Sequence, residues 1–223
     1  WRFFNGVFDT AEDTLPHLDE LGTPASNNHY NTGWAWAFDT PFPYWKRWAG
    51  FEGGTADVCL VSWPEKITVH GELRDQYVHA VDVVPTIYDL LDIDPPQVIN
   101  GHPQLPIEGE SFADALHDAD APAKSTQFYA MLGQRSIYHE GYLACTVHPP
   151  LSSWGNFEAD EWELYHLASD RSQSHNIAQD EPERLEVLKS LWFYEAGRLN
   201  GLPLDDRSAL EQVLAERPRA ADP

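Results

Sequence analysis

The chain has 223 residues, of which 42% are hydrophobic and 13% aromatic, enough apolar side chain to bury a core and to exclude a disordered protein. Its 36 acidic and 14 basic residues give a formal net charge of −22, so nucleic acids and anionic membrane surfaces are disfavoured as partners. An anionic ligand would have to be held by local bases against this field, which makes any cluster of bases informative.

The sequence shows neither a membrane span nor a disulfide framework. No run of 18 apolar residues indicates a transmembrane helix. The opening stretch WRFFNGVFDT has neither the basic start nor the apolar core of a signal peptide. Cys59 and Cys145 are too few for a set of disulfides, and Cys59 is expected to be a small core residue. We therefore expect a cytoplasmic protein with no membrane partner.

The first fifty residues predict one short helix and one long loop. In residues 9–22, Leu15, Leu18 and Leu21 share a helical face, and Gly22 can end the helix. Residues 23–50 are aromatic and contain Asn, Pro and Gly throughout, with no clear period. A long ordered loop of this kind usually carries function.

Two adjacent cations, Lys46 and Arg47, precede an apolar run in the stretch FPYWKRWAGFEGGTADVCLVSWP, residues 42–64. The run at 56–63 is typical of a strand covered on both faces, and Pro64 ends it. Gly53 and Gly54 predict a sharp turn with backbone angles that other residues resist. The cations then lie on the loop that enters a buried strand. There they could hold a tetrahedral anion, or Lys46 could be an ordinary exposed loop lysine.

The stretch VHAVDVVPTIYDLLDIDPP, residues 78–96, predicts a helix. Asp82 can cap its first turn, and Val84, Ile87 and Leu91 line one side. His79 and Asp82 could face one another as metal ligands, but a capping carboxylate beside a packed histidine explains them better. Residues 94–125, rich in Pro, Gly and Asp, predict a linker.

The second half predicts an antiparallel meander followed by a helix. Four β-leaning pieces, TQFYAML, RSIYHEG, YLACTVHPP and WELYHLASD, follow one another, and Gly133 and Gly141 separate the first three. The stretch EPERLEVLKSLWFYEAGRL then predicts an amphipathic helix. Its apolar stripe consists of Leu185, Leu188, Leu191 and Trp192.

One buried strand and one helix cannot make a two-sided parallel sheet, so we expect the chain to be the C-terminal portion of a larger protein. The expected fold class is α/β, with two domains. Residues 1–110 are the remnant of an α/β core with an active-site loop. Residues 111–223 form a small antiparallel subdomain with a C-terminal helix and tail.

Common catalytic and ligand-binding motifs are absent from the sequence. The ten histidines form neither H-E-x-x-H nor H-x-H, and no acid–histidine cluster has metal-ligand spacing. There is no G-x-S-x-G, Walker motif or G-x-G-x-x-G.

Five stretches together resemble the C-terminal part of the sulfatase family, in the alkaline-phosphatase-like superfamily, and its actinobacterial-type arylsulfatases in particular. These stretches are GWAWAFDTPFPYWKRW, GGTADVCLVSWP, RDQYVHAVDVVPTIYDLL, PIEGESF and WELYHLASDRSQSHNIA. They follow the order of the family over roughly residues 28–200. The resemblance implies an alkaline-phosphatase-like α/β core.

The resemblance also implies a reaction and a site. Sulfatases use a formylglycine, made from Cys or Ser, and a divalent cation, usually calcium. The late sulfate-contacting lysine of the family falls on Lys46, with Arg47 as a rival because the spacing from Lys46 to Gly53 is one residue longer than usual. His29 and Trp36 are the matching candidates for substrate binding, and the aromatic residues of 34–48 would line the substrate pocket.

The C-x-P-x-R nucleophile motif and the paired metal-binding aspartates of the family are missing from the sequence. We therefore expect the missing N-terminal sulfatase portion to supply both, and this chain alone to be inactive. The predicted function is the C-terminal part of a sulfuric ester hydrolase acting on sulfate esters. The alternatives are a phosphate or phosphonate monoester hydrolase of the same superfamily, and a non-catalytic interaction module.

Overall fold

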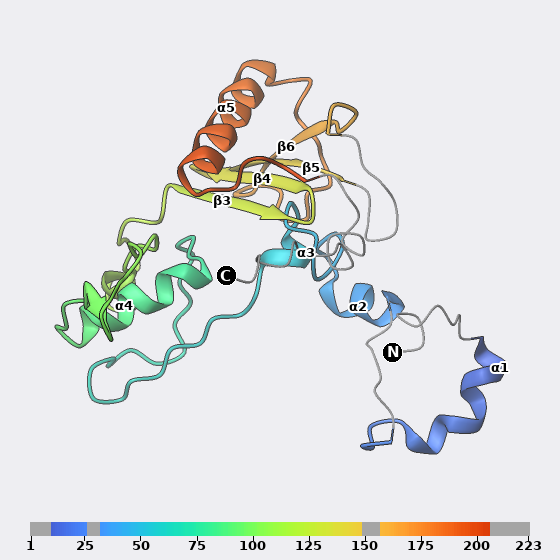
Figure 1. Cartoon of the computed structure of the whole chain (residues 1–223), viewed down its shortest axis with the longest axis horizontal. Helices are drawn as coiled ribbons and strands as arrows, with labels where there is room; N and C mark the ends of the chain where they lie inside the picture. Colours follow the sequence, from blue (N-terminus) through green and yellow to red (C-terminus); the bar gives the residue numbers. More distant parts are fainter. Residues whose placement is uncertain (1–9, 26–31, 149–156, 206–223) are drawn as a thin grey trace, which may run out of the picture. The chain divides into compact units, whose positions relative to one another are not determined.

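A computed structural model describes residues 10–25, 32–148 and 157–205, and the chain divides into two compact units, Trp1–Thr40 and Pro41–Pro223 (Figure 1). No helix in these ranges is both long enough and apolar enough to cross a membrane. The domain boundary expected at residues 110 and 111 falls inside the second unit and stays a prediction.

The first unit contains the short helix α1 (Ala11–Thr14), the 3-10 helix η2 (Leu15–Glu20) and helix α2 (Thr32–Asp39). Thr10 caps α1, since its side chain accepts from the backbone N–H of Asp13. The helix predicted over 9–22 is thus present as α1 and η2. The prediction of a long loop over 23–50 is wrong at residues 32–39, where the sequence TGWAWAFD forms a helix despite its aromatic residues.

The second unit is built on a four-stranded antiparallel sheet in the order β3-β4-β5-β6. The strands are β3 (Thr126–Met131), β4 (Gln134–His139), β5 (Tyr142–Thr146) and β6 (Trp162–His166). Two-residue turns at 132–133 and 140–141 join the first three, and both residues of each turn have positive φ. Such turns match the twist of a hairpin and favour Gly at their second position, where Gly133 and Gly141 stand. The predicted meander is confirmed.

Helix α5 (Pro182–Arg198) covers one face of this sheet (Figure 1). Alternate residues of a strand point to opposite faces, and Ile137, Ala144 and Leu164 form the face beneath the helix. Leu188 and Trp192 of the predicted stripe are buried against them. The predicted fold class, mixed helices and strands with a helix packed on an antiparallel sheet, is confirmed.

The other face of the sheet is covered by the segment before α3 (Glu52–Thr55). Phe51 is buried against the strand residues Tyr138, Leu143, Cys145 and Tyr165. The aromatic residues Tyr44 and Trp48 pack against the same cluster, with their ring centroids 4.2 Å apart. The sheet is therefore enclosed on both faces. The cover on this second face was not predicted from the sequence.

The buried strand predicted at 56–63 is wrong for this chain. Residues 56–79 form no strand, and the side chains of Val58 and Leu60 are 85% and 90% exposed. Cys59, expected in the core, is exposed as well. The apolar composition of residues 56–63 would suit a covered strand, but no described segment covers this stretch.

Along the chain, the 3-10 helix η3 (Ala80–Asp82) and helix α4 (Val83–Leu90) follow this stretch and precede the strands of the sheet. The predicted linker contains the two-stranded hairpin of β1 (Val98–Ile99) and β2 (His102–Pro103) and the 3-10 helix η4 (Ala113–Leu116). The predicted apolar side of α4 is exposed, whereas its Thr86 is buried.

Candidate functional site

The two adjacent cations of the sequence stand on a segment that we call the cation loop, residues 42–55. Lys46 is exposed and Arg47 is half-buried, and both line an open cleft in the second unit. Arg47 and Tyr44 hold left-handed backbone conformations, with φ of 86° and 62°. Residues other than Gly adopt such angles at an energetic cost, so surrounding contacts must hold the loop in this shape.

The cations that line the cleft differ in their partners. Lys124 lies 2.6 Å from a carboxylate oxygen of Asp82, and Arg198 lies 2.6 Å from one of Glu108. Within the described part of the chain, neither Lys46 nor Arg47 forms an ion pair. In a chain with a net charge of −22, these two cations are available to an anion.

Three buried side chains hold the backbone of the cation loop, two on strand β4 and one in the segment after β6. The N–H of Ala49 donates to Oε1 of Gln134 at 2.8 Å, and Oγ of Ser136 donates to the Ala49 carbonyl at 2.6 Å. Gln173 accepts from the N–H of Glu52 at 2.7 Å and donates to the Gly50 carbonyl at 2.9 Å. The three side chains thus bind both N–H groups and carbonyl groups of the loop backbone.

Glycines in the loop allow close approach of the backbone. A Cβ on Gly53 would lie 2.4 Å from the carbonyl oxygens of Pro43 and Tyr44, and one on Gly54 would lie 2.3 Å from that of Trp48. Neither glycine has positive φ, so the predicted reason, a turn with unusual backbone angles, is wrong. Close packing of the loop on itself is the requirement.

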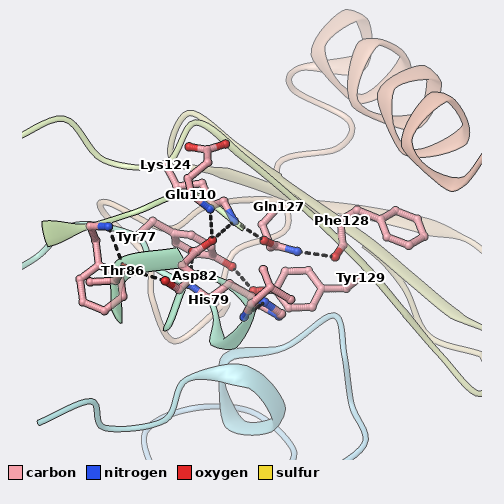
Figure 2. A network of polar contacts seen from close by, with 11 residues as sticks. Tyr77, His79, Asp82, Thr86, Glu110, Lys124, Gln127, Phe128 and Tyr129 are labelled. Atoms are coloured by element: carbon pink, nitrogen blue, oxygen red, sulfur yellow. Dashed lines mark hydrogen bonds and ion pairs between the residues drawn. The ribbon is translucent and has the colours of Figure 1, made fainter. Parts of the chain in front are cut away.

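A buried polar network lies on another wall of the cleft, around Asp82 (Figure 2). The two carboxylate oxygens of Asp82 accept from the backbone N–H groups of His79 and Glu110, at 2.7 Å and 2.8 Å, and from Lys124. His79 in turn accepts from Val81, so His79 and Asp82 form a capping box. The capping interpretation of this pair is confirmed.

Two phenols lie beside this network and do not provide a base at neutral pH. The hydroxyls of Tyr77 and Tyr129 are 2.5 Å apart. Burial raises the pKa of Tyr77 well above its ordinary value and raises that of Tyr129 to about 12. Both groups therefore stay protonated and act as hydrogen-bonding groups.

The remaining residues predicted for the site are Trp36 and His29. Trp36 lies on α2 in the first unit, with 61% of its surface exposed. His29 lies outside the described residues. Their roles in substrate binding stay predictions. Tyr44 and Trp48 pack on the sheet core, so the prediction that the aromatics of 34–48 line the pocket is wrong for these two.

Sequence reasoning missed Gln134 and Gln173. Their partners in the cation loop are 85 and 121 residues away in the chain, and no local pattern connects such positions. A glutamine also carries no ionisable group that would have made it stand out as a site residue.

The described residues do not fit the calcium or the formylglycine that the resemblance implies. No group of three or more His, Cys, Asp or Glu side chains in the described ranges could hold a metal ion. Cys145 is buried, and this burial raises the pKa of its thiol. Neither Cys145 nor Cys59 stands in the C-x-P-x-R motif from which formylglycine is made.

Comparisons with known proteins show that this chain belongs to the sulfatase family. Residues 43–194 match the family model described as N-sulphoglucosamine sulphohydrolase, C-terminal. An uncharacterized sulfatase of Schizosaccharomyces pombe is 29% identical over 185 residues, which cover 80% of this chain and 32% of that protein. An arylsulfatase of Klebsiella aerogenes is 30% identical over 106 residues, which cover 48% of this chain and 22% of that protein.

A solved structure from Bacteroides thetaiotaomicron, described with the metabolism of multiple glycosaminoglycans, is 18% identical. The aligned region covers 65% of this chain and 30% of the solved chain, with a TM-score of 0.48. The present chain thus spans about a third or less of the length of the curated relatives it matches.

Proposed function

This chain belongs to the sulfatase family through its N-sulphoglucosamine sulphohydrolase C-terminal domain, and from that membership we propose that it is the C-terminal part of a hydrolase of sulfate monoesters. The arylsulfatase of Klebsiella aerogenes supports an aryl sulfate as the substrate to test first. A phosphate monoester is the competing substrate within the same superfamily.

The observation that carries the proposal is the pair of available cations on the cleft. Lys124 and Arg198 are neutralised by Asp82 and Glu108, while the described residues offer no acidic partner to Lys46 or Arg47. A sulfate monoester has non-bridging oxygens that need positive charge around them. It also has a bridging oxygen on which negative charge develops as the ester bond breaks.

We assign the sulfate contact to Lys46, with Arg47 as its rival. Lys46 is the more exposed of the two, and a compact ammonium can donate to one sulfate oxygen while the substrate is held by other groups. Its contribution is electrostatic: the ammonium lowers the energy of the charge that develops on the leaving oxygen. Arg47 would then support the loop conformation and add to the local positive field.

We also propose that residues outside this chain supply the nucleophile and the metal ligands. Two observations support this step: the chain spans 32% of its Schizosaccharomyces pombe relative, and no described cluster of side chains fits a metal ion. His29 and Trp36 remain candidates for substrate binding. The domain boundary at residues 110 and 111 would separate the core part from the antiparallel subdomain.

The test compares two forms of the protein on two substrates. One form is residues 1–223, and the other is the same chain joined to, or mixed with, an N-terminal sulfatase portion from its natural reading frame. The substrates are nitrophenyl sulfate and nitrophenyl phosphate, each with calcium. We expect the completed form to cleave the sulfate and residues 1–223 to cleave neither. Robust turnover by residues 1–223 alone would overturn the proposed incompleteness, and a preference for the phosphate would overturn the substrate class.

A further inference from the structure

The strongest unexplained feature of the second unit is the set of buried amide side chains under the cation loop. Gln134 and Gln173 are 5% and 6% exposed. Oε1 of Gln134 and both amide polar atoms of Gln173 form hydrogen bonds with the loop backbone. Burying an amide costs free energy unless it is hydrogen-bonded, so these contacts fix the loop backbone opposite them.

The contacts fall just after the two cations. Ala49 is two residues beyond Arg47, and its N–H and carbonyl are held by Gln134 and Ser136. Gln173 then holds the Gly50 carbonyl and the N–H of Glu52. Side chains thus hold the backbone at Ala49, Gly50 and Glu52, three of the five residues that separate Arg47 from Gly53.

The N–H of Glu52 shows why the clamp needs a side chain. Glu52 begins the single turn α3, and the first N–H groups of a helix have no carbonyl partner within it. Gln173 supplies the missing acceptor at 2.7 Å. Without it, this buried N–H would be unsatisfied and the entry into α3 would change.

The loop cannot keep its shape through the cations themselves. Arg47 has a left-handed backbone, and neither it nor Lys46 has an ion-pair partner among the described side chains. Gly50 is pressed against the sheet, since a Cβ there would lie 2.7 Å from Cβ of Cys145. The contacts that hold residues 49–52 therefore help to set the direction in which Lys46 and Arg47 project, together with the packing of Tyr44 and Trp48 on the sheet core.

We propose that Gln134 and Gln173 are positioning residues, which act through the loop backbone to place the Lys46 and Arg47 charges at the reacting sulfate. This inference rests on the proposed function. A charge that stabilises a transition state must stand where the charge develops, and a displacement of about 1 Å can cost about a hundredfold in rate. The antiparallel subdomain then has a role in the reaction without touching the substrate.

The first measurement is amide hydrogen exchange in residues 1–223. Gln173→Leu should raise the exchange of the Glu52 amide and of its neighbours in the loop, while strands β4 and β5 keep their protection. Gln134→Glu keeps an oxygen acceptor for Ala49 and should retain the loop protection that Gln134→Leu loses. The matched control is Gln97→Leu, because Gln97 is exposed and, among the described residues, its side-chain amide contacts only the Pro95 carbonyl two residues away.

The second measurement is steady-state kinetics of the completed enzyme on nitrophenyl sulfate. Gln173→Leu should lower kcat tenfold or more with KM changed less than threefold, since the loss is of charge placement in the transition state. In a Lys46→Ala, Arg47→Ala background, the same Gln173→Leu change should lower kcat less than threefold, because the groups it positions are gone. If Gln173→Leu fails to fold, Gln134→Leu and Gln173→Met are measured in its place.

The outcomes separate this inference from the proposed function. If removing the cations lowers kcat while Gln173→Leu and Gln134→Leu leave it unchanged, the positioning role is overturned and the sulfatase role of the cations stands. An equal fold-loss from Gln173→Leu with and without the cations also overturns positioning. If removing both cations leaves kcat unchanged, the proposed function of the loop fails, whatever the exchange data show.

Discussion

The ammonium of Lys124 lies 2.6 Å from Oδ1 of Asp82, and the two side chains are 6% and 2% exposed. This ion pair joins the residues just before β3 to the start of α4. The Asp82 carboxylate also accepts hydrogen bonds from two backbone N–H groups, so both of its oxygens have partners (Figure 2). The contact links the sequence on the two sides of the boundary predicted at residues 110 and 111.

Lys124→Met should destabilise the fold by about 3–5 kcal/mol, because it leaves the buried carboxylate of Asp82 without its counter-charge. Urea unfolding of residues 1–223 at pH 7 measures the change. The double variant Lys124→Met with Asp82→Asn should recover part of the loss, since no unpaired charge is then buried.

The matched control is Lys189→Met. Lys189 pairs with Glu186 on the surface of α5, and such exposed pairs contribute about 0–1 kcal/mol. Equal losses from Lys124→Met and Lys189→Met would contradict the assignment of a buried ion pair.

Trp192→Ala should cost about 3–5 kcal/mol, the usual range for removing a large buried aromatic. Trp192 is fully buried on the face of α5 that packs on the sheet, and its indole N–H donates to the Tyr129 carbonyl at 3.0 Å. Denaturant unfolding gives the loss. Tyr194→Ala on the same helix is the control, because Tyr194 is 66% exposed and should cost less than about 1 kcal/mol. A loss below that figure for Trp192→Ala would show that the helix does not depend on this contact.

Folding stability should decrease below neutral pH because of His79. Burial lowers the pKa of His79 from its ordinary 6.5, and the nearby Lys124 lowers it further against the opposing effect of Asp82. A lowered folded pKa means that the unfolded state binds more protons. The stabilisation from neutral His79 is therefore complete above pH 6.5 and is lost as the pH falls toward the folded pKa.

The measurement is the free energy of unfolding of the wild type and of His79→Asn at several pH values from 7.5 to 5. Asparagine keeps a side-chain acceptor at this capping position but does not titrate. The stability of the wild type relative to the variant should shrink as the pH falls. Parallel pH profiles for the two proteins would show that His79 does not couple to folding.

Residues 1–223 by themselves should aggregate through the stretch at 56–63. Its apolar side chains are open to solvent, with Leu60 90% exposed, and no described segment covers them. Leu60→Lys should slow aggregation, measured by light scattering, without lowering the midpoint of thermal unfolding. Glu65→Gln, which raises the net charge by the same one unit at another exposed site nearby, is the control for the effect of net charge. Equal aggregation of wild type and Leu60→Lys would show that another surface is responsible for aggregation.

The antiparallel sheet and α5 could be predicted because their signals are local. Each hairpin has Gly at a turn position that needs positive φ, and α5 carries its apolar stripe within one run of sequence. The capping box at His79 and Asp82 is local for the same reason, since its two partners are three residues apart.

The features that the sequence did not predict depend on distant parts of the chain. The stretch at 56–63 has the composition of a covered strand, but composition does not say which segment covers it. The cover of the second sheet face and the clamp on the cation loop join residues about 85–120 positions apart, such as Ala49 and Gln134. Lys46 could be predicted as a site residue because of the family resemblance and its position in a cluster of positive charge. Gln134 and Gln173 have no charge and stood in no recognised motif, so they were not predicted.

The most direct test of the central claim is the kinetics of Lys46→Ala and Arg47→Ala in the completed enzyme with nitrophenyl sulfate as substrate. If Lys46 contacts the sulfate, Lys46→Ala should lower kcat by about 10²–10³, the usual cost of removing one donor to a developing charge. Lys46→Arg should restore it only in part, since a planar guanidinium differs from a compact ammonium. Arg47→Ala should cost far less than Lys46→Ala. A kcat/KM for Lys46→Ala close to that of the wild type would contradict the account and leave Lys46 an ordinary surface lysine.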